Sequence, residues 1–315
     1  MRLLITGGAG FIGSHIADAA LSNGWQVAVV DNLVSGRKEN VPADAAFYEI
    51  DICDRAAVEK AFQEFRPTAV SHQAAQASVA VSVREPQMDA TVNILGSLNI
   101  LTASVAHAVE RVVFASTGGA IYGEVPDGIR ASVSYSPVPI SPYACSKFAV
   151  EKYLECFRQQ SGLAYTVLRY ANVYGPRQDP HGEAGVVAIF CNRILAGEGI
   201  QINARKQPGD EGCVRDYVFV EDVVRANIAA LSGQIPDPIL NVGTGLETTT
   251  QQLAEVLQQE IGNTVEMKPA PMRAGDVERS LLDADRLQEL LGPVVSIKEG
   301  LARTAVWFKE RHQNS

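Results

Sequence analysis

Residues 2–14 read RLLITGGAGFIGS, a short apolar run that leads into a glycine-rich turn. The glycines at positions 7, 10 and 13 have the spacing of a loop that passes tightly from a strand into a helix. Missing side chains allow a sharp turn and the close approach of a pyrophosphate, which the free N–H groups of the following helix can bind. A plain tight turn would show the same glycines, so the motif needs support from the rest of the chain.

Outward from this loop, short apolar runs alternate with longer helical patterns. The pattern predicts strands at residues 2–6, 26–31, 46–50, 68–73, 111–116, 164–169 and 239–242. It predicts helices at residues 11–22, 55–65, 88–107, 142–160, 185–196, 220–231, 249–260 and 298–311. Continuous apolar strands suit a parallel sheet that is covered by helices on both faces. We therefore expect an α/β fold with a Rossmann-type, doubly wound parallel sheet.

The pattern loosens after about residue 170, where Pro and Gly recur and strands become sparse. We expect residues 1–170 to form the dinucleotide-binding domain and residues 171–315 to form a smaller α/β domain that binds the substrate. No change in composition marks the boundary, so its position is soft. We also expect the chain to cross back between the two domains.

Composition excludes several classes of protein. The net charge of −9 argues against nucleic-acid binding, which favours basic surfaces. Five cysteines and five histidines show no metal-ligand spacing, so we expect reduced thiols, a cytoplasmic location and no metal. No apolar run reaches the ~20 residues of a membrane span, so no membrane partner is expected.

Two acids follow predicted strands where the adenosine half of a dinucleotide would bind. Asp31 lies roughly 20 residues beyond the glycine loop, which is where an acid that accepts from both ribose hydroxyls is expected. It would repel a 2′-phosphate and so favours NAD over NADP, although Arg37 and Lys38 in the next loop could bind that phosphate. Asp51, followed by Ile52, can accept from the adenine amino group. Either acid could instead cap a turn.

Tyr143 and Lys147 lie at the start of a predicted helix. Ser141 is a natural N-cap and Pro142 a natural first residue, so the tyrosine lies in the first turn and the lysine one turn later on the same face. A nearby ammonium favours the phenolate, so we expect the pKa of Tyr143 to fall toward neutrality. The phenolate would then be a general base toward a sugar hydroxyl.

Two hydroxyls, Ser116 and Thr117, end the preceding apolar strand, where an active-site hydroxyl is expected at the carboxyl edge of the sheet. A Tyr–Lys pair alone is common on helix surfaces. A hydroxyl, a phenol and a lysine that follow a dinucleotide loop form a far more specific set.

These motifs resemble the extended short-chain dehydrogenase/reductases, and within them the NAD-dependent sugar-nucleotide epimerase/dehydratase family. The resemblance runs almost end to end. It is carried by TGGAGFIG at 6–13, HQAA at 72–75, the segment 116–123, YACSK at 143–147, RYANVYGPR at 169–177, RDYV at 215–218 and RAGD at 273–276. It implies bound NAD and an isomerase that inverts carbon 4 of a UDP-hexose through a transient 4-keto intermediate.

The resemblance also implies the roles of individual residues. The catalytic set is Thr117, Tyr143 and Lys147, with Thr117 favoured over Ser116 because the family's catalytic hydroxyl is usually the later one. Besides Tyr143 and Lys147, the residues expected to bind NAD are Gly7, Gly10, Phe11, Ile12, Gly13, Asp31, Asn32, Asp51, Ile52, Gln73, Ala74, Ala75, Asn93 and Tyr170. Besides Thr117 and Tyr143, those expected to bind the UDP-sugar are Ser116, Asn172, Arg215, Arg273, Asp276 and Ser280.

The substrate residues divide by chemistry. Arg215 and Arg273 can hold a diphosphate bidentately, while Asp276 suits ribose hydroxyls. Ser280, four residues beyond Asp276, occupies the position that borders carbon 2 of the sugar in epimerases which this chain resembles. A small residue there leaves room for an N-acetyl group, so we expect UDP-GlcNAc and UDP-GalNAc as further substrates. The alternative is that Ser280 is a surface residue after a turn.

Two other functions remain open. Dehydratases of this family place Asp-Glu directly after the catalytic threonine, where this chain has Gly118-Gly119. A dehydratase or decarboxylase would therefore lack its acid–base pair. A non-catalytic NAD sensor on the same fold would have no need of Thr117, Tyr143 and Lys147.

Two predicted helices have apolar residues on more than one face. They are Val92, Ile94, Leu95, Leu98 and Leu101 on one helix, and Phe148, Val150, Tyr153, Leu154 and Phe157 on the other. One face must cover the sheet. The resemblance implies that the second face is buried in a homodimer.

Overall fold

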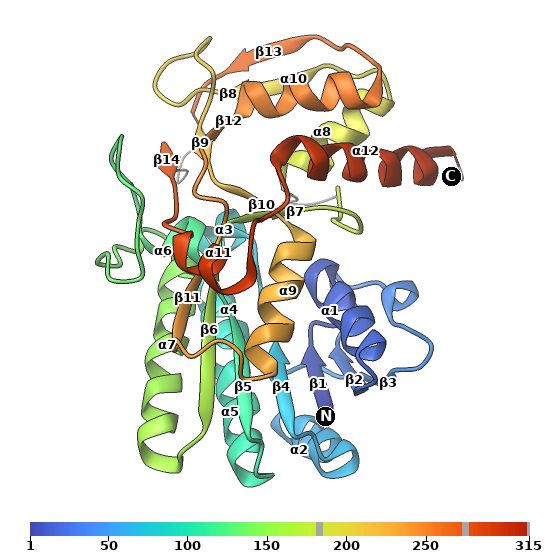
Figure 1. The fold of residues 1–315 in the computed structure, drawn as a ribbon, viewed down its shortest axis with the longest axis vertical. Helices are drawn as coiled ribbons and strands as arrows, with labels where there is room; N and C mark the ends of the chain where they lie inside the picture. Colours follow the sequence, from blue (N-terminus) through green and yellow to red (C-terminus); the bar gives the residue numbers. More distant parts are fainter. Residues whose placement is uncertain (181–184, 273–276, 314–315) are drawn as a thin grey trace. The chain divides into compact units, whose positions relative to one another are not determined.

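The central element is a seven-stranded sheet in the order β11-β6-β5-β4-β1-β2-β3 (Figure 1). The computed structural model describes residues 1–180, 185–272 and 277–313. Pairs β1–β2, β1–β4, β2–β3 and β4–β5 are parallel, and the order reverses at β1. The predicted Rossmann-type sheet is confirmed. Its strands are β1 (Arg2–Thr6), β2 (Gln26–Asp31), β3 (Ala46–Glu49), β4 (Ala69–His72), β5 (Arg111–Thr117), β6 (Ala164–Tyr170) and β11 (Ile239–Val242).

The apolar strands form these elements because both of their faces are buried. Leu3, Leu4 and Ile5 of β1 are completely buried, as expected of a central parallel strand. The helices that connect these strands or pack against them are α1 (Phe11–Ser22), α2 (Arg55–Phe65), α3 (Val79–Arg84), α4 (Pro86–Ala90), η2 (Thr91–Gly96), α5 (Ser97–Ala106), α7 (Pro142–Ser161) and α9 (Val220–Leu231). A short 3-10 helix, η1 (Lys38–Asn40), follows β2.

The helix predicted at 88–107 is wrong in its details. It begins earlier, at Pro86, and it is interrupted by η2, whose hydrogen bonds are those of a π-helix. A π-helix within a longer helix widens one turn and is frequent at functional sites. Apolar periodicity alone could not show this, because it follows burial and not the hydrogen-bond pattern.

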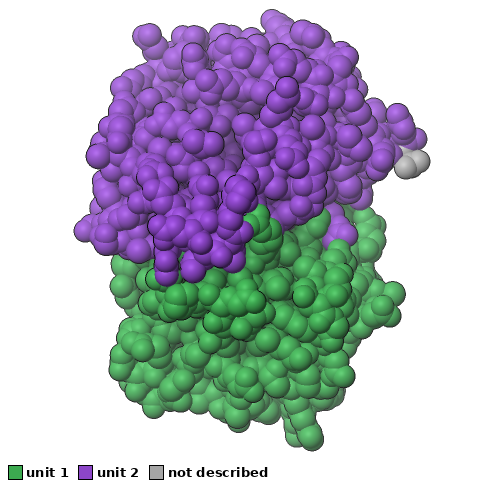
Figure 2. All heavy atoms as spheres, in the orientation of Figure 1, with its two compact units in different colours: residues 1–117, 139–169, 224–240 green, residues 118–138, 170–223, 241–315 purple. Residues whose placement is uncertain are grey.

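The chain forms two compact units, which are coloured separately in Figure 2. Unit 1 comprises residues 1–117, 139–169 and 224–240, and unit 2 comprises residues 118–138, 170–223 and 241–315. The chain therefore passes between the units several times.

Unit 2 is built from short elements. Its helices are α6 (Gly118–Ile121), α8 (Val186–Leu195), α10 (Thr250–Ile261), α11 (Asp285–Leu291) and α12 (Ile297–Gln313). Its strands are β7 (Asn172–Tyr174), β8 (Ile200–Asn203), β9 (Val214–Arg215), β10 (Tyr217–Phe219), β12 (Thr248–Thr249), β13 (Met267–Ala270) and β14 (Arg279–Ser280). They pair as β12-β9-β14, β10-β7 and β13-β8. Strands are thus more numerous here than the sequence predicted, because runs of two to four residues leave no readable periodicity.

Two features concern the described residues as a whole. None of the helices found in them is long and apolar enough to cross a membrane. Over the same ranges, no cluster of three or more His, Cys, Asp or Glu side chains is arranged to hold a metal ion.

Candidate active site

The glycine loop joins β1 to α1 and leaves no room for side chains. Gly7 has a φ of +68°, and a Cβ there would lie 2.7 Å from the backbone N of Ala74. A Cβ on Gly13 would lie 2.2 Å from the carbonyl oxygen of Gly7. Helix α1 begins after Gly10 without a side-chain cap, so its first N–H groups are available to an anion. This cradle of backbone fits the pyrophosphate of a dinucleotide.

Asp31 lies at the end of β2 and is tied to the same loop. Its Oδ2 accepts from the backbone N of Ala9 at 3.0 Å and its Oδ1 from the backbone N of Leu33 at 2.9 Å. A Cβ on Gly36 would lie 2.7 Å from Oδ1, so the carboxylate is also fixed from the other side. These bonds orient the carboxylate, and each oxygen keeps a further lone pair for a ribose hydroxyl.

The next acid is held in a similar way. Asp51 Oδ1 accepts from the backbone N of Cys53 at 2.8 Å, and Oδ2 accepts from Asn32 Nδ2 at 3.0 Å. The Cys53 N–H is the main cause that lowers the pKa of Asp51. The Ile52 side chain is buried, and a Cβ on Gly96 would lie 2.7 Å from its Cδ1. The Ile52 carbonyl oxygen accepts from Asn99 Nδ2 at 2.9 Å, and a contact of Ile52 with the cofactor stays a prediction.

The segment after β4 lies against the glycine loop. Ala74 N donates to Thr6 Oγ1 at 3.2 Å, and Gln73 Nε2 donates to Ser71 Oγ and to Asn227 Oδ1. Ala75 follows in the same irregular segment, and the binding of NAD by Gln73, Ala74 and Ala75 stays a prediction. The Gln73 amide N is already committed within the protein.

His72 is structural in its surroundings. It is completely buried, with Nδ1 2.6 Å from Thr6 Oγ1 and Nε2 2.8 Å from Ser97 Oγ. Burial, with a smaller contribution from the charge of Lys147, lowers the pKa of His72 to about 3. The ring is therefore neutral at physiological pH. Its hydrogen bonds to Thr6 and Ser97 link β4 to β1 and to α5.

Asn93 is buried on η2 and uses both ends of its amide inside unit 1. Oδ1 accepts from the backbone N of Gln76 at 2.9 Å. Nδ2 donates to Gln76 O and to Asp89 Oδ1, both at 2.9 Å, and to Ser146 Oγ at 3.3 Å. Asn93 thus links the segment after β4 to α7. A direct contact of Asn93 with the cofactor stays a prediction.

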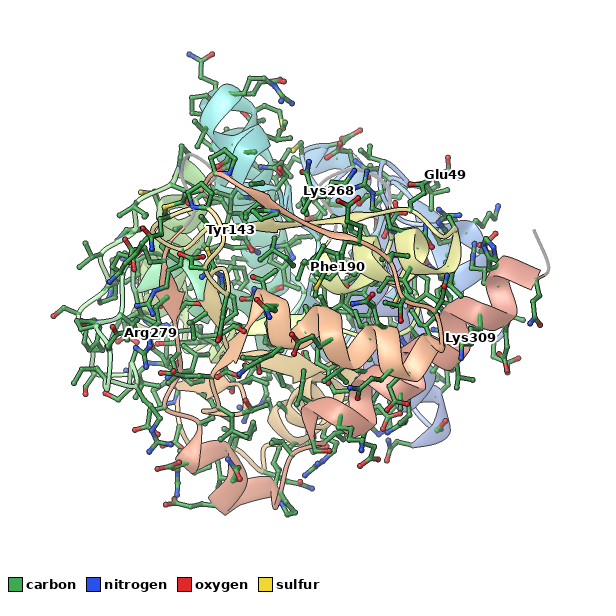
Figure 3. All side chains as sticks on the ribbon, turned by 90° about the horizontal axis from the view of Figure 1, so that it is seen from above. Glu49, Tyr143, Phe190, Lys268, Arg279 and Lys309 are labelled. Atoms are coloured by element: carbon green, nitrogen blue, oxygen red, sulfur yellow. The ribbon has the colours of Figure 1, made fainter. Side chains whose placement is uncertain are left out.

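Helix α7 begins as the sequence predicts. The Ser141 side chain accepts from the backbone N of Ala144, and Pro142 is the first helical residue. Tyr143 (labelled in Figure 3) lies in the first turn, and the buried Lys147 lies one turn later. Lys147 Nζ donates to the carbonyl oxygen of Ala115 at 2.9 Å and lies 4.8 Å from the centre of the Phe114 ring.

The structure separates the two hydroxyls at the end of β5. Ser116 Oγ donates to Glu151 Oε1 at 2.6 Å. Glu151 is itself paired with Arg169, at 2.6 Å between Oε2 and Nη2, and both side chains are buried. Thr117 is instead hydrogen-bonded to the phenol of Tyr143. The geometry therefore places Thr117, and not Ser116, beside the tyrosine.

The expected fall in the pKa of Tyr143 is wrong for the chain's own groups. Burial and, next, the carboxylate of Asp89 raise it to about 12, although the hydrogen bond from Thr117 acts in the opposite direction. Burial also lowers the pKa of Lys147 to about 8, against the attraction of Asp89. The loss of hydration raises the pKa of Tyr143 more than the nearby Lys147 ammonium was expected to lower it, because a phenolate in a buried site has little water to stabilise it.

Asn172 opens β7 in unit 2 and lies next to Gly119. Asn172 N donates to Asp216 O at 2.9 Å. A Cβ on Gly119 would lie 2.9 Å from Asn172 Oδ1, so a larger residue at 119 would push this side chain aside. Tyr170, at the end of β6, is also buried.

Arg215 and Ser280 are direct partners in the parallel pair β9–β14, so their side chains lie on the same face. Arg215 Nη1 and Nη2 donate to the carbonyl oxygens of Val214 and Val277 at 3.0 and 2.7 Å. Ser280 is only 3% exposed, which excludes the alternative of a surface residue. Arg273 and Asp276 lie outside the described residues.

Among the buried charged residues that sequence reasoning missed are Arg279 in unit 2 and Asp89 in unit 1. Arg279 (labelled in Figure 3) is 1% exposed and precedes Ser280 on β14. Asp89 is 1% exposed, and it lies four residues before Asn93. That helical spacing was visible in the sequence for Asp89, whereas nothing local distinguishes Arg279 from an ordinary surface arginine.

Comparison with known proteins gives consistent results. The profile of the NAD dependent epimerase/dehydratase family matches residues 3–243. The UDP-glucose 4-epimerase of Mycolicibacterium smegmatis is 42% identical over 320 residues, covering 99% of this chain and 100% of that protein. The Thermus thermophilus UDP-glucose 4-epimerase in complex with NAD superposes with a TM-score of 0.95 at 54% identity, covering 98% and 99% of the chains. The Methanobrevibacter ruminantium UDP-N-acetylglucosamine 4-epimerase, in complex with UDP-N-acetylmuramic acid, gives 0.90 at 34%, covering 98% of each.

Proposed function

This chain belongs to the NAD dependent epimerase/dehydratase family, and on that premise we propose that it interconverts UDP-glucose and UDP-galactose by inverting carbon 4. The observation that carries the proposal is the hydrogen bond between Thr117 and Tyr143, with Lys147 one turn further along α7 in the unit that holds the glycine loop. The reaction makes the chain an isomerase of galactose metabolism.

The chain's own residues move the proton. Tyr143 Oη accepts the proton of the sugar's 4-hydroxyl and later returns it, while the Thr117 hydroxyl donates to the phenolate oxygen. The Lys147 ammonium, held at Ala115 O, adds positive charge to the site. When bound, oxidised NAD supplies a hydride acceptor for carbon 4 and a further positive charge that favours the phenolate. Because the hydride transfer that NAD would supply is reversible, the inversion would involve no net oxidation of the sugar.

The cofactor is held by unit 1. The backbone around Gly7, Gly10 and Gly13 binds the pyrophosphate, and Asp31 binds the adenosine ribose. Phe11 and Ile12 offer the first N–H groups of α1, and Asn32, Asp51 and Ile52 border the adenine. In unit 2, Asn172, Arg215, Arg273 and Asp276 bind the UDP group of the substrate.

A dehydratase is disfavoured by the close approach at Gly119. Dehydratases that this chain resembles need an acid in this segment, and any side chain at 119 would displace Asn172. The substrate range is instead extended by Ser280, because a small buried side chain on the same face as Arg215 leaves room at carbon 2 of the sugar. We therefore include UDP-GlcNAc and UDP-GalNAc among the substrates.

A homodimer accounts for the apolar surface of unit 1. Three of its large apolar side chains are well exposed: Leu95 on η2 at 56%, Tyr153 on α7 at 41% and Val105 on α5 at 38%. A second copy of the chain would bury them. The five cysteines are free, which suits the reducing conditions of the cytoplasm.

The function is tested by following nucleotide sugars with NMR. Purified protein incubated with UDP-glucose or UDP-galactose should drive either sugar to the same mixture of both, without added oxidant. Denaturation should release about one NAD(H) per chain, since a cofactor regenerated in each cycle has no need to leave. A protein that leaves every UDP-hexose unchanged, or releases NADP instead, is not this enzyme.

A further inference from the structure

Asp89 is a buried carboxylate to which the reaction described above assigns no role. It lies on α4 and is 1% exposed. Oδ1 accepts from Gln76 Nε2 and from Asn93 Nδ2, each at 2.9 Å. Oδ2 is buried and has no hydrogen-bond partner among the described residues. Such a carboxylate is costly unless a positive charge compensates for its lost hydration.

A chain of hydrogen bonds connects Asp89 to the catalytic helix. Asn93 Nδ2, which donates to Asp89 Oδ1, also lies 3.3 Å from Ser146 Oγ on α7. Ser146 directly precedes Lys147 and lies three residues after Tyr143. Because α4 and η2 both pack against α7, the carboxylate is built into the support of the Tyr–Lys pair.

The charges around α7 leave Lys147 as the cation that Asp89 can balance. Glu151, one turn beyond Lys147, is neutralised by Arg169. His72 on β4 is buried and uncharged, because burial lowers its pKa to about 3. On α3, Arg84 forms an exposed pair with Glu85. The negative charge of Asp89 raises the pKa of both Tyr143 and Lys147.

We propose that Asp89 is a positioning residue of this epimerase, whose buried carboxylate balances the Lys147 ammonium and, through Asn93 and Ser146, holds α7 in its position. It touches neither substrate nor reacting atoms. The inference rests on the proposed function for its kinetic test only.

Replacing Asp89 by Asn tests the charge while keeping an oxygen that can accept the Asn93 bond. Loss of the negative charge favours the phenolate of Tyr143 and disfavours the ammonium of Lys147, so both pKa values fall. If turnover requires phenolate and ammonium, both limbs of the kcat/KM profile move to lower pH, by about one unit or more. Asp89→Glu keeps the charge and should leave the limbs where they are in the wild type.

A direct titration separates this inference from the function. Ultraviolet difference spectra of Asp89→Asn against Asp89→Asn/Tyr143→Phe, both loaded with NAD, isolate the ionisation of Tyr143. Its midpoint should lie below that of the matching wild-type pair. This holds whether or not the protein turns over UDP-hexoses, so a negative result here rejects the role of Asp89 alone.

Asp222→Asn is the matched control, because Asp222 is an equally buried carboxylate of unit 2 that accepts from the backbone N of Val295. It should leave both limbs and the Tyr143 midpoint unchanged. If Asp89→Asn lowers activity at every pH without moving either limb, or if Asp222→Asn moves them equally, Asp89 only supports the fold and the proposal is wrong.

Discussion

Units 1 and 2 each bury an arginine, and they do so in different ways. In unit 1, Arg169 pairs through two hydrogen bonds with Glu151, which in turn accepts from Ser116. In unit 2, Arg279 pairs with the half-exposed Glu247 and also binds backbone. Its Nη1 donates to the carbonyl oxygens of Val125, Pro126 and Ile129. The three carbonyls that Arg279 satisfies belong to the irregular segment 125–129, which forms no strand, whereas the two carbonyls of β14 accept from the backbone N–H groups of Val125 and Asp216.

The difference shows what holds the functional side chains in position in each unit. The proton-transfer groups lie on a regular, twenty-residue helix and at the end of a long strand. Ser280 and Arg215 lie on strands of two residues, which depend on Arg279 and its loop for their position. Chemistry in unit 1 and binding in unit 2 should therefore respond separately to mutation.

The largest difference between the effect on turnover and the effect on UDP binding is expected from Tyr143→Phe. Removal of the phenol should lower kcat by about 100- to 10,000-fold, because general acid–base groups contribute that much, while affinity for UDP stays the same. Steady-state kinetics and calorimetric titration with UDP measure the two effects. Turnover close to that of the wild type would remove Tyr143 from the mechanism.

The hydroxyls of β5 provide an internal control. Thr117→Val should be slower than Ser116→Ala, because Thr117 bonds to Tyr143 whereas Ser116 bonds to Glu151. The reverse order would transfer the catalytic hydroxyl to Ser116.

Stability should distinguish the two arginines. Arg169→Met leaves the Glu151 carboxylate buried without its cationic partner, which should cost about 3–5 kcal/mol. Arg279→Met leaves Glu247, which is 49% exposed and can be hydrated, so about 1–3 kcal/mol is expected from the carbonyls that lose their donors. Urea unfolding measures both. Arg169→Met/Glu151→Leu should recover most of the loss, and equal losses in the single variants would contradict the comparison.

Binding should depend on unit 2. Arg215→Ala should weaken UDP affinity by about 10- to 100-fold, since hydrogen bonds to charged groups contribute about 1.5–3 kcal/mol each. The Tyr143 midpoint in the ultraviolet titration should not move. Unchanged affinity for UDP would place the diphosphate elsewhere.

The finest effect concerns selectivity. Ser280→Tyr should reduce turnover of UDP-GlcNAc and UDP-GalNAc by about 10-fold or more through steric exclusion, and largely spare UDP-glucose and UDP-galactose. Ser280→Ala, which keeps the space, should retain both pairs of substrates. A wild type that ignores the acetylated pair, or a tyrosine variant that loses both pairs alike, would show that Ser280 does not limit the sugar.

Sequence alone determined the elements whose reasons are local. The glycine loop, the acid Asp31 after β2 and the Tyr143–Lys147 spacing follow from φ restrictions, strand length and helical periodicity, which act within about one turn or one strand. Continuous apolar runs also predicted the buried parallel sheet, because both of its faces are covered.

Only the tertiary structure decided which neighbours these residues have. Thr117 is hydrogen-bonded to Tyr143, whereas Ser116 is hydrogen-bonded to Glu151. Ser280 is buried beside Arg215, and Arg279 and Asp89 are both buried charges. The tertiary structure also raised the pKa of Tyr143 where the Lys147 spacing predicted a fall. Burial and hydrogen-bond partners arise from segments far apart in the chain, and burial controls the energy of a charge more strongly than spacing along a helix does.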